Sequence, residues 1–156
     1  MAIDVAAYVL MTLRATSAVT DLVVSDEAGI FESGDCTADA LANAEITRRE
    51  AGNPAKVLAL VVQDAGEKAL DARRTEQRTN VWLFDRQRGY ANIRTVRRQI
   101  YLTLQSKSTA LTFPYDGQSA MVDMEMESRT GHRHEHMLSV DFELMTFTAI
   151  VQLDLG

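Results

Sequence analysis

The strongest constraint on the fold is a period-two alternation of apolar and polar residues in two segments near the C-terminus. Residues 122–127 carry Val, Met and Met on one parity with Asp, Glu and Glu between them, and residues 138–144 repeat the pattern. This period is that of a strand with one buried face and one wet face. We therefore predict an antiparallel pair joined by a hairpin loop at 130–133. In the second strand Leu138, Val140, Phe142 and Leu144 are expected to face the core, with Ser139, Asp141 and Glu143 in solvent.

Further strands are predicted upstream. Residues 57–62 are apolar on both parities and rich in Val, which indicates a strand covered on both faces. Residues 75–84 form a longer strand whose second half is also apolar on both sides, so the following helix and either a second sheet layer or a neighbouring subunit must cover it. A short strand is expected at 28–31. The polar stretch 64–72 is interpreted as a flexible connection, and 146–155 either extends the last strand or docks on a partner.

Helical periodicity marks two segments, 2–15 and 88–105, each with apolar residues recurring every three to four positions. Residues 37–50 form either a helix capped by Thr37 or an irregular connection, and Gly52-Asn53-Pro54 ends them. A turn is predicted at 113–117. The predicted fold class is α+β, with a mainly antiparallel sheet, an N-terminal helix and a central helix packed on it, in a single domain spanning 1–156.

Composition excludes several classes of protein. The chain of 156 residues has a net charge of −6, which argues against wrapping around duplex DNA. Its single Cys excludes an internal disulfide framework. No apolar run reaches the length of a membrane helix, and the N-terminus lacks the basic region of a secretory signal. We expect a soluble, intracellular, mildly acidic protein.

The charge is unevenly distributed along the chain. Residues 73–98 contain eight Arg against two acids, a balance of +6, so the remainder carries −12. The default interpretation is a set of solvated faces. A sharper hypothesis is head-to-tail self-association, in which a basic surface meets an acidic one on the next copy and the chain of contacts closes into a ring. Nucleic-acid binding is the weakest alternative, because the arginines are not interleaved with aromatic residues.

Three groups of residues are candidates for catalysis or metal binding. His132, His134 and His136 share one face if they lie on a strand and could hold a metal, but a chance cluster in a loop is favoured. Cys36 has acidic neighbours that would raise its pKa, so a buried or idle thiol is expected. The acids of 123–127 are explained as the wet face of a strand. We therefore predict no catalytic residue, no metal and no cofactor.

The order of elements resembles a known family. The resemblance runs from the N-terminal helix into 17–23, then through 29–31 and the apolar strand 56–63. Its strongest part is the segment Arg78-Thr79-Asn80-Val81-Trp82-Leu83-Phe84-Asp85 with the helix after it, and it ends in Ser139-Val140-Asp141-Phe142-Glu143-Leu144. These features resemble the tail-terminator (tail-completion, minor tail) proteins of long-tailed bacteriophages. The stretch 37–54 is longer than the connection typical of that family.

The resemblance implies a virion structural protein without enzymatic activity, assembled in the host cytoplasm and located in the tail or neck. Such proteins form a homohexameric ring that caps the tail tube, ends its polymerisation and presents an interface to the head–tail connector and neck proteins. DNA passes through the lumen without specific binding, and acids lining that lumen would repel its phosphates. No membrane is involved.

Contacts between subunits or rings are expected from the arginine-rich strand and helix and from residues 64–76. The predicted contact residues are Arg73, Arg74, Arg78, Arg94, Arg97 and Arg98. The nearest alternative is another neck protein, a head-completion or stopper ring. An alternative from a different class is a small metal-dependent hydrolase that uses the 132–136 histidines, and a third is a small binding module unrelated to phage.

Overall fold

The computed structural model describes residues 4–86, 90–105, 109–112 and 119–153. Four α-helices and seven strands follow one another there in an α+β order. The helices are α1 (Val5–Ala15), α2 (Ser17–Thr20), α3 (Ala38–Ala51) and α4 (Tyr90–Leu104), with a 3-10 turn at Asp26–Gly29. The strands are β1 (Ile30–Glu32), β2 (Ala59–Ala69), β3 (Arg74–Arg86), β4 (Thr109–Thr112), β5 (Ser119–Arg129), β6 (Arg133–Glu135) and β7 (Val140–Leu153).

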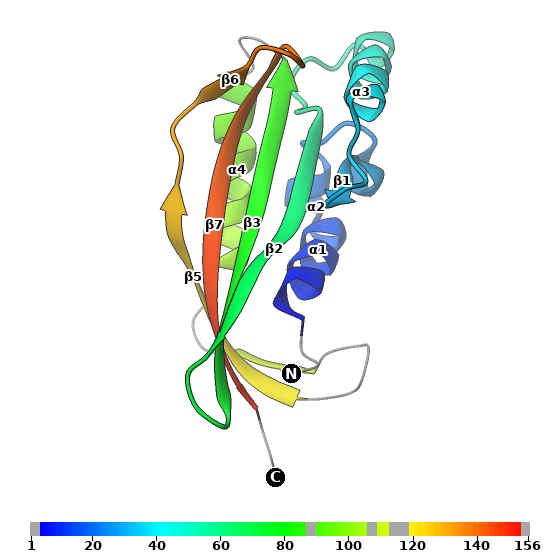
Figure 1. The fold of residues 1–156 in the computed structure, drawn as a ribbon. Coiled ribbons are helices and arrows are strands. Elements are labelled where there is room, and N and C mark those ends of the chain that lie inside the picture. The colour runs from blue at the N-terminus through cyan, green and yellow to red at the C-terminus, as the bar shows by residue number, and fades with distance from the viewer. Residues whose placement is uncertain (1–3, 87–89, 106–108, 113–118, 154–156) are drawn as a thin grey trace.

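The strands form one long, twisted sheet in the order β1-β2-β3-β7-β5-β4, with β6 paired to the edge of β7 (Figure 1). Only the β1–β2 pair is parallel, and the other pairs are antiparallel. The central pair runs from Arg74 opposite Gln152 to Arg86 opposite Val140. The predicted fold class, α+β with a mainly antiparallel sheet, is confirmed.

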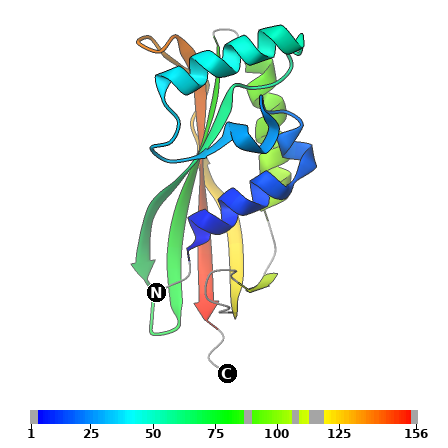
Figure 2. The same cartoon turned by 90° about the vertical axis from the view of Figure 1, so that its right-hand side faces the viewer.

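One face of the sheet, called the inner face here, is covered by α1, α2 and α4 (Figure 2). Strands β3 and β7 place every second side chain on it, and the apolar stripes of α1 and α4 pack against them. Its fully buried side chains include Leu13, Leu83, Ile93, Ile100, Met145 and Phe147. Each contributes about 1.5–3 kcal/mol through burial of its apolar surface, so the inner face holds the main core. The stripe predicted for 88–105 is confirmed from Tyr90 on, and residues 87–89 lie outside the described part.

The N-terminal helix is fixed at its first turn. The Asp4 side chain accepts a hydrogen bond from the Ala7 backbone amide, a cap that stabilises a helix by about 1 kcal/mol. The Val5 amide donates to Gln77 Oε1 at 3.0 Å, which ties α1 to β3. The helix predicted for 2–15 is therefore confirmed for 5–15.

Residues 38–51 form a helix, so the first of the two alternatives left open for this stretch is confirmed. The Thr37 side chain accepts from the Ala40 amide, and Gly52 ends the helix at a φ of 65°, a left-handed conformation that glycine adopts without strain. Helix α3 crosses the end of the sheet (Figure 2). Leu41 packs there with Leu58, Ala59 and Val140 in a second, smaller core.

The interpretation of 64–72 as a flexible connection was wrong. Strand β2 continues to Ala69 and pairs with β3 as far as Ala69 opposite Thr75, with a bulge between Asp64 and Glu67. Gly66 lies in this bulge at a φ of 116°, which a side chain would strain. Strand β2 is exposed from Asp64 on. The segment is therefore polar because its side chains face solvent, although its backbone is that of a strand.

The faces predicted for 141–144 in the last strand were inverted, whereas Val140 is buried as predicted, in the smaller core. Asp141 and Glu143 are 3 % and 0 % exposed, whereas Phe142 and Leu144 are only half-buried. Farther along β7 the side chains of Met145, Phe147, Ala149 and Val151 lie on the inner face. Because alternate residues of a strand share a face, Asp141 and Glu143 lie on the inner face as well. Leu138 lies in the turn before β7 and is 40 % exposed.

Most of the other strand predictions are confirmed. Val122 and Met124 are buried with Asp123 and Glu125 exposed, and residues 59–62 are buried on both parities, as predicted. Residues 146–153 extend the last strand. The expected loop at 130–133 leads into β6 rather than directly into β7. The turn predicted at 113–117 lies outside the described residues. Among the described residues, no helix combines the length and apolar character needed to cross a membrane.

Candidate functional site

The outer face of the sheet carries an apolar cluster near the C-terminal end of β3 and the start of β7. The rings of Trp82 and Phe84 stack with their planes 8° apart and their centroids 6.3 Å apart, and Phe142 lies 5.8 Å from Trp82 and 6.3 Å from Phe84. All three are half-buried, as is Leu144 beside Trp82 in the register. Helices α1, α2 and α4 lie on the opposite side, and Phe84 packs against the smaller core that includes Leu41 of α3, so the cluster is only partly covered.

Beside the cluster lies a mainly apolar cleft of about 240 Å³, between the outer face and the start of α3. We call it the α3 cleft, and its lining residues are Gly34, Cys36, Thr37, Ala38, Leu41, Val61, Trp82, Phe84 and Leu138. The exposed acids Glu32, Asp35 and Asp39 belong to the same segments as its lining. Within the described part of the chain, these three carboxylates form no ion pair. The cleft is therefore lined mainly by apolar side chains, and the segment 32–39 that supplies part of this lining, called the acidic rim below, carries three exposed acids.

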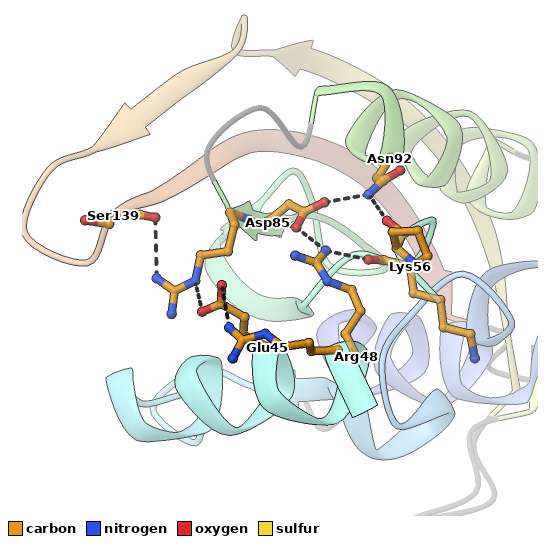
Figure 3. Close-up of polar contacts among 9 residues, drawn as sticks. Glu45, Arg48, Lys56, Asp85, Asn92 and Ser139 are labelled. Carbon is orange, nitrogen blue, oxygen red and sulfur yellow. Dashed lines mark hydrogen bonds and ion pairs between the residues drawn. The ribbon is translucent and has the colours of Figure 1, made fainter. Parts of the chain in front are cut away.

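Buried polar contacts hold α3 in place at this end of the sheet (Figure 3). Arg48 contacts Asp85 Oδ1 at 2.5 Å and donates to the Lys56 carbonyl, while Asn92 of α4 donates to Asp85 Oδ2 at 3.0 Å. Arg86 pairs with Glu45 at 2.6 Å. Because Asp85 is fully buried with both oxygens engaged, α3, β3 and α4 are locked together and the cleft is preformed.

Three of the predicted contact residues, Arg73, Arg74 and Arg78, lie on the β2–β3 hairpin, which projects past the helices (Figure 1). Arg74 pairs with Asp71 at 2.8 Å within the turn. Hydrogen bonds to Asp71 from the Arg73 amide and from Arg74 hold the pKa of that carboxyl below its usual range. Arg78 reaches across β7 to Glu127 on β5 at 3.1 Å. The hairpin thus presents three exposed guanidinium groups.

The other three, Arg94, Arg97 and Arg98, lie on α4. Arg97 donates to both oxygens of Glu143 at 2.8 Å and so holds the helix to β7. Arg94 lies over the Tyr90 ring at 4.4 Å and lowers the pKa of that phenol through a hydrogen bond and its charge. Arg94 and Arg98 are exposed, and Arg98 makes no ion pair among the described residues. The structure therefore places the six arginines on two separate surfaces.

The histidines gather around a buried acid that we had expected in solvent. His132 Nε2 lies 2.9 Å and His134 Nδ1 lies 2.6 Å from the two oxygens of Asp141. His136 packs edge-on against His134 with ring centroids 4.9 Å apart. Within the part of the chain that the structure describes, no group of three or more His, Cys, Asp or Glu could hold a metal ion. This cluster fixes β6 against β7.

Cys36 lies at the wall of the α3 cleft. Burial raises the pKa of its thiol, so the thiolate is scarce at neutral pH. The direction is the one expected, but the cause is burial rather than the acidic neighbours. No base contacts this thiol among the described residues, and it has the character of a cleft-lining apolar group.

Sequence patterns missed the outer cluster as a feature distinct from the core. The signal was present: the odd-numbered residues 145–151 are all apolar, and extending that parity backward assigns Phe142 and Leu144 to the opposite face. The contribution of α3 to the cleft could not have been found, because it depends on where a long connection crosses the sheet.

The comparisons with known proteins bear on the fold. The sequence matches no known family profile and no curated protein. Among solved structures, a chain in "Virion of native gene transfer agent (GTA) particle" matches with a TM-score of 0.56, covering 94% of this chain and 93% of that chain at 11% sequence identity. At this identity the likeness shows a shared fold over nearly the whole length of both chains.

Proposed function

We propose that this protein is a virion structural protein, a tail terminator. In this role it forms a homohexameric ring on the end of a phage tail tube, stops tube polymerisation and joins the tail to the head through connector or neck proteins. The observation that carries the proposal is the likeness in fold, over almost all of both chains, to a chain of a gene transfer agent virion.

The surfaces described above support an assembly role. The subunit has an open apolar cluster on one face of its sheet and exposed arginines on the helix of the other face. Two unlike surfaces on opposite faces suit head-to-tail association, which forms a ring when the rotation between successive copies closes. The polar side-chain clusters described above, around Asp85, Glu143 and Asp141 with its two histidines, hold strands and helices of the subunit in place.

We assign the two arginine surfaces to different partners. The hairpin arginines Arg73, Arg74 and Arg78 contact the last ring of the tail tube, because the hairpin projects from the end of the sheet (Figure 1). The α4 arginines Arg94 and Arg98 contact the neighbouring subunit. Arg97 is bound within its own subunit by Glu143, and we therefore assign it to holding α4. DNA passes through the lumen without specific binding.

The experiment is removal of the gene from the producing virus or particle, with imaging of the tails. A tail terminator predicts tubes of uncontrolled length that fail to join heads, and restoration of normal tails by the added protein. Antibody labelling should mark the head-proximal end of the tube. Tails of normal length without the protein, or labelling elsewhere in the particle, would contradict the proposal.

The same experiment separates the nearest alternative. A head-completion or stopper ring, also a neck protein, has the same support from the fold. Its loss would leave finished tails of normal length next to unjoined heads, whereas loss of a terminator changes tail length itself. The hydrolase alternative has no metal site to support it within the described residues, where no group of three or more His, Cys, Asp or Glu could hold a metal ion.

A further inference from the structure

The outward side of α4 carries an amphipathic ridge in which Arg94 contacts Tyr90 of the same helix, while Arg98 forms no ion pair within the described part of the chain. Arg94, Arg98 and Leu102 follow one another at intervals of four, so they line up on one side of the helix over about 12 Å. That side is opposite the buried stripe through Ile93 and Ile100. Leu102, in the last turn of α4, is 59 % exposed and supplies the apolar part of this ridge.

The α3 cleft on the other side of the sheet has the complementary character. Its lining includes the apolar side chains of Leu41, Trp82 and Phe84. The acidic rim, residues 32–39, supplies other lining residues and carries three exposed acids that form no ion pair within the described part of the chain. The ridge therefore carries two guanidinium groups beside one leucine, and the cleft adjoins a segment with three carboxylates. Both the charges and the apolar parts match.

The two surfaces cannot meet within one subunit. Helix α4 lies on the inner side of the sheet, whereas the N-terminal end of α3 reaches the outer side (Figure 2). Any contact between them joins two copies, and because different surfaces are used, the contact is heterologous and each copy offers both halves.

We propose that the α4 ridge of one subunit docks into the α3 cleft of the next, with Leu102 in the apolar hollow and Arg94 and Arg98 on the acids of the rim. The inference rests on the proposed function, since it supplies the contact by which the ring closes. The occupant of the cleft is a second copy of this chain, and Trp82 is the residue at the centre of the receiving surface.

The single native cysteine allows a direct test, because Cys36 lines the cleft. In the Leu102→Cys variant, a short bifunctional maleimide should join Cys36 of one copy to the new thiol of the next. The reaction is run at mildly alkaline pH because burial raises the pKa of the Cys36 thiol, and labelling of wild-type Cys36 by a monofunctional maleimide under the same conditions verifies that this thiol reacts. Each copy then carries one donor and one acceptor position, so the products are a ladder of dimers, trimers and larger species. The matched control is Met11→Cys, which also replaces an exposed apolar residue, on α1 and away from both surfaces.

A ladder from Leu102→Cys, with none from the wild type or Met11→Cys, is the expected result. Products that stop at dimers would indicate an isologous contact and overturn the proposal. Absence of any cross-link, both in concentrated protein and in purified particles, would overturn it as well, and would show that the cleft takes some other partner or none.

Charge reversal gives an independent readout. Arg94→Glu with Arg98→Glu should weaken self-association at least about tenfold, as should Asp35→Arg with Asp39→Arg. Combining all four changes in one chain should restore association, because every copy then carries both reversed halves. Failure of the combined variant to recover, with each pair still folded by circular dichroism, would contradict the contact.

Failure of this inference is distinguishable from failure of the proposed function. Rings that cap tubes without the 36–102 cross-link would leave the tail-terminator role standing and remove this contact. A 36–102 ladder in a protein that is absent from virus particles would keep the contact and remove the role.

Discussion

The two faces of the sheet use the same strands but differ in what covers them. On the inner face the side chains of β3 and β7 are sealed by α1, α2 and α4, and even two carboxylates, Asp141 and Glu143, are buried there with partners. On the outer face three aromatic rings lie half-exposed beside an open cleft. The inner face explains why the subunit folds, and the outer face has apolar surface left over for association.

The largest expected effect is a difference in the free energy of unfolding between the same substitution, Phe to Ala, made on each of the two faces. Phe147→Ala on the inner face should lower the free energy of unfolding by about 3–5 kcal/mol, because it leaves a cavity in a close-packed core. Phe142→Ala on the outer face should cost about 1–2 kcal/mol, since the ring is already partly in water. Urea denaturation of both variants measures the difference. Equal losses would show that the outer cluster is core rather than surface.

The next effect concerns the buried charge on the inner face. Arg97→Met leaves Glu143 fully buried without the guanidinium that donates to both of its oxygens. This should lower the free energy of unfolding by about 3 kcal/mol. The value is at the lower end for a broken buried pair, because Arg129 still lies 3.6 Å from Glu143. The double variant Arg97→Met with Glu143→Met removes the unpaired charge and should recover most of that loss. A double variant no more stable than Arg97→Met would contradict this account of the pair.

A smaller effect on stability, with a large effect on assembly, is expected at the hairpin. Arg74→Glu with Arg78→Glu should change the free energy of unfolding by less than about 1 kcal/mol, because both side chains are half-exposed. Association with tail tubes should nevertheless weaken, as measured by co-sedimentation and tail length. Arg49→Glu, at an exposed position on α3, serves as the control. Unchanged association and unchanged tail length would count against the assignment of this surface.

Some features of the fold could be predicted from a local sequence pattern and others could not. Strand β5 and helix α4 follow from periodicity, because each has enough apolar residues on one parity or stripe to define its buried side, and β3 follows from a long strand pattern whose second half is apolar on both parities. The faces of 138–144 could not be assigned locally, since both parities carry a reason to be buried: the apolar one packs in the outer cluster, and the acidic one pairs with arginine and histidine from other elements.

The candidate site was predicted only in part. The arginines were identified from the charge asymmetry, but charge along the chain does not show that Arg97 turns inward while Arg98 turns outward. Similarly, the apolar second half of 75–84 indicated that something covers each face, with a neighbouring subunit as one alternative. The α3 cleft depends on the path of 33–58 across the sheet end, which no local pattern specifies.

The smallest effect is at the hairpin turn and depends on pH. The pKa of Asp71 is lower in the folded protein than in the unfolded chain, mainly because the Arg73 amide donates to it. The turn is therefore fully stabilised above the carboxyl's ordinary pKa and loses that stabilisation as the pH falls through the lowered value. The protection factors of the amides in residues 70–74, which correct for the intrinsic pH dependence of exchange, should fall over that range, while Asp71→Asn should show no such transition. A pH-independent wild-type turn would contradict the role of this carboxylate.

The most direct test of the account is a high-resolution cryo-electron microscopy reconstruction of the head-proximal end of the tail. The account predicts a closed ring of this protein on the last tube ring, with the outer sheet face of each copy against α4 of the next and the β2–β3 hairpins on the tube. A reconstruction in which the outer cluster of Trp82, Phe84 and Phe142 faces solvent, or in which this protein forms no ring, would contradict it.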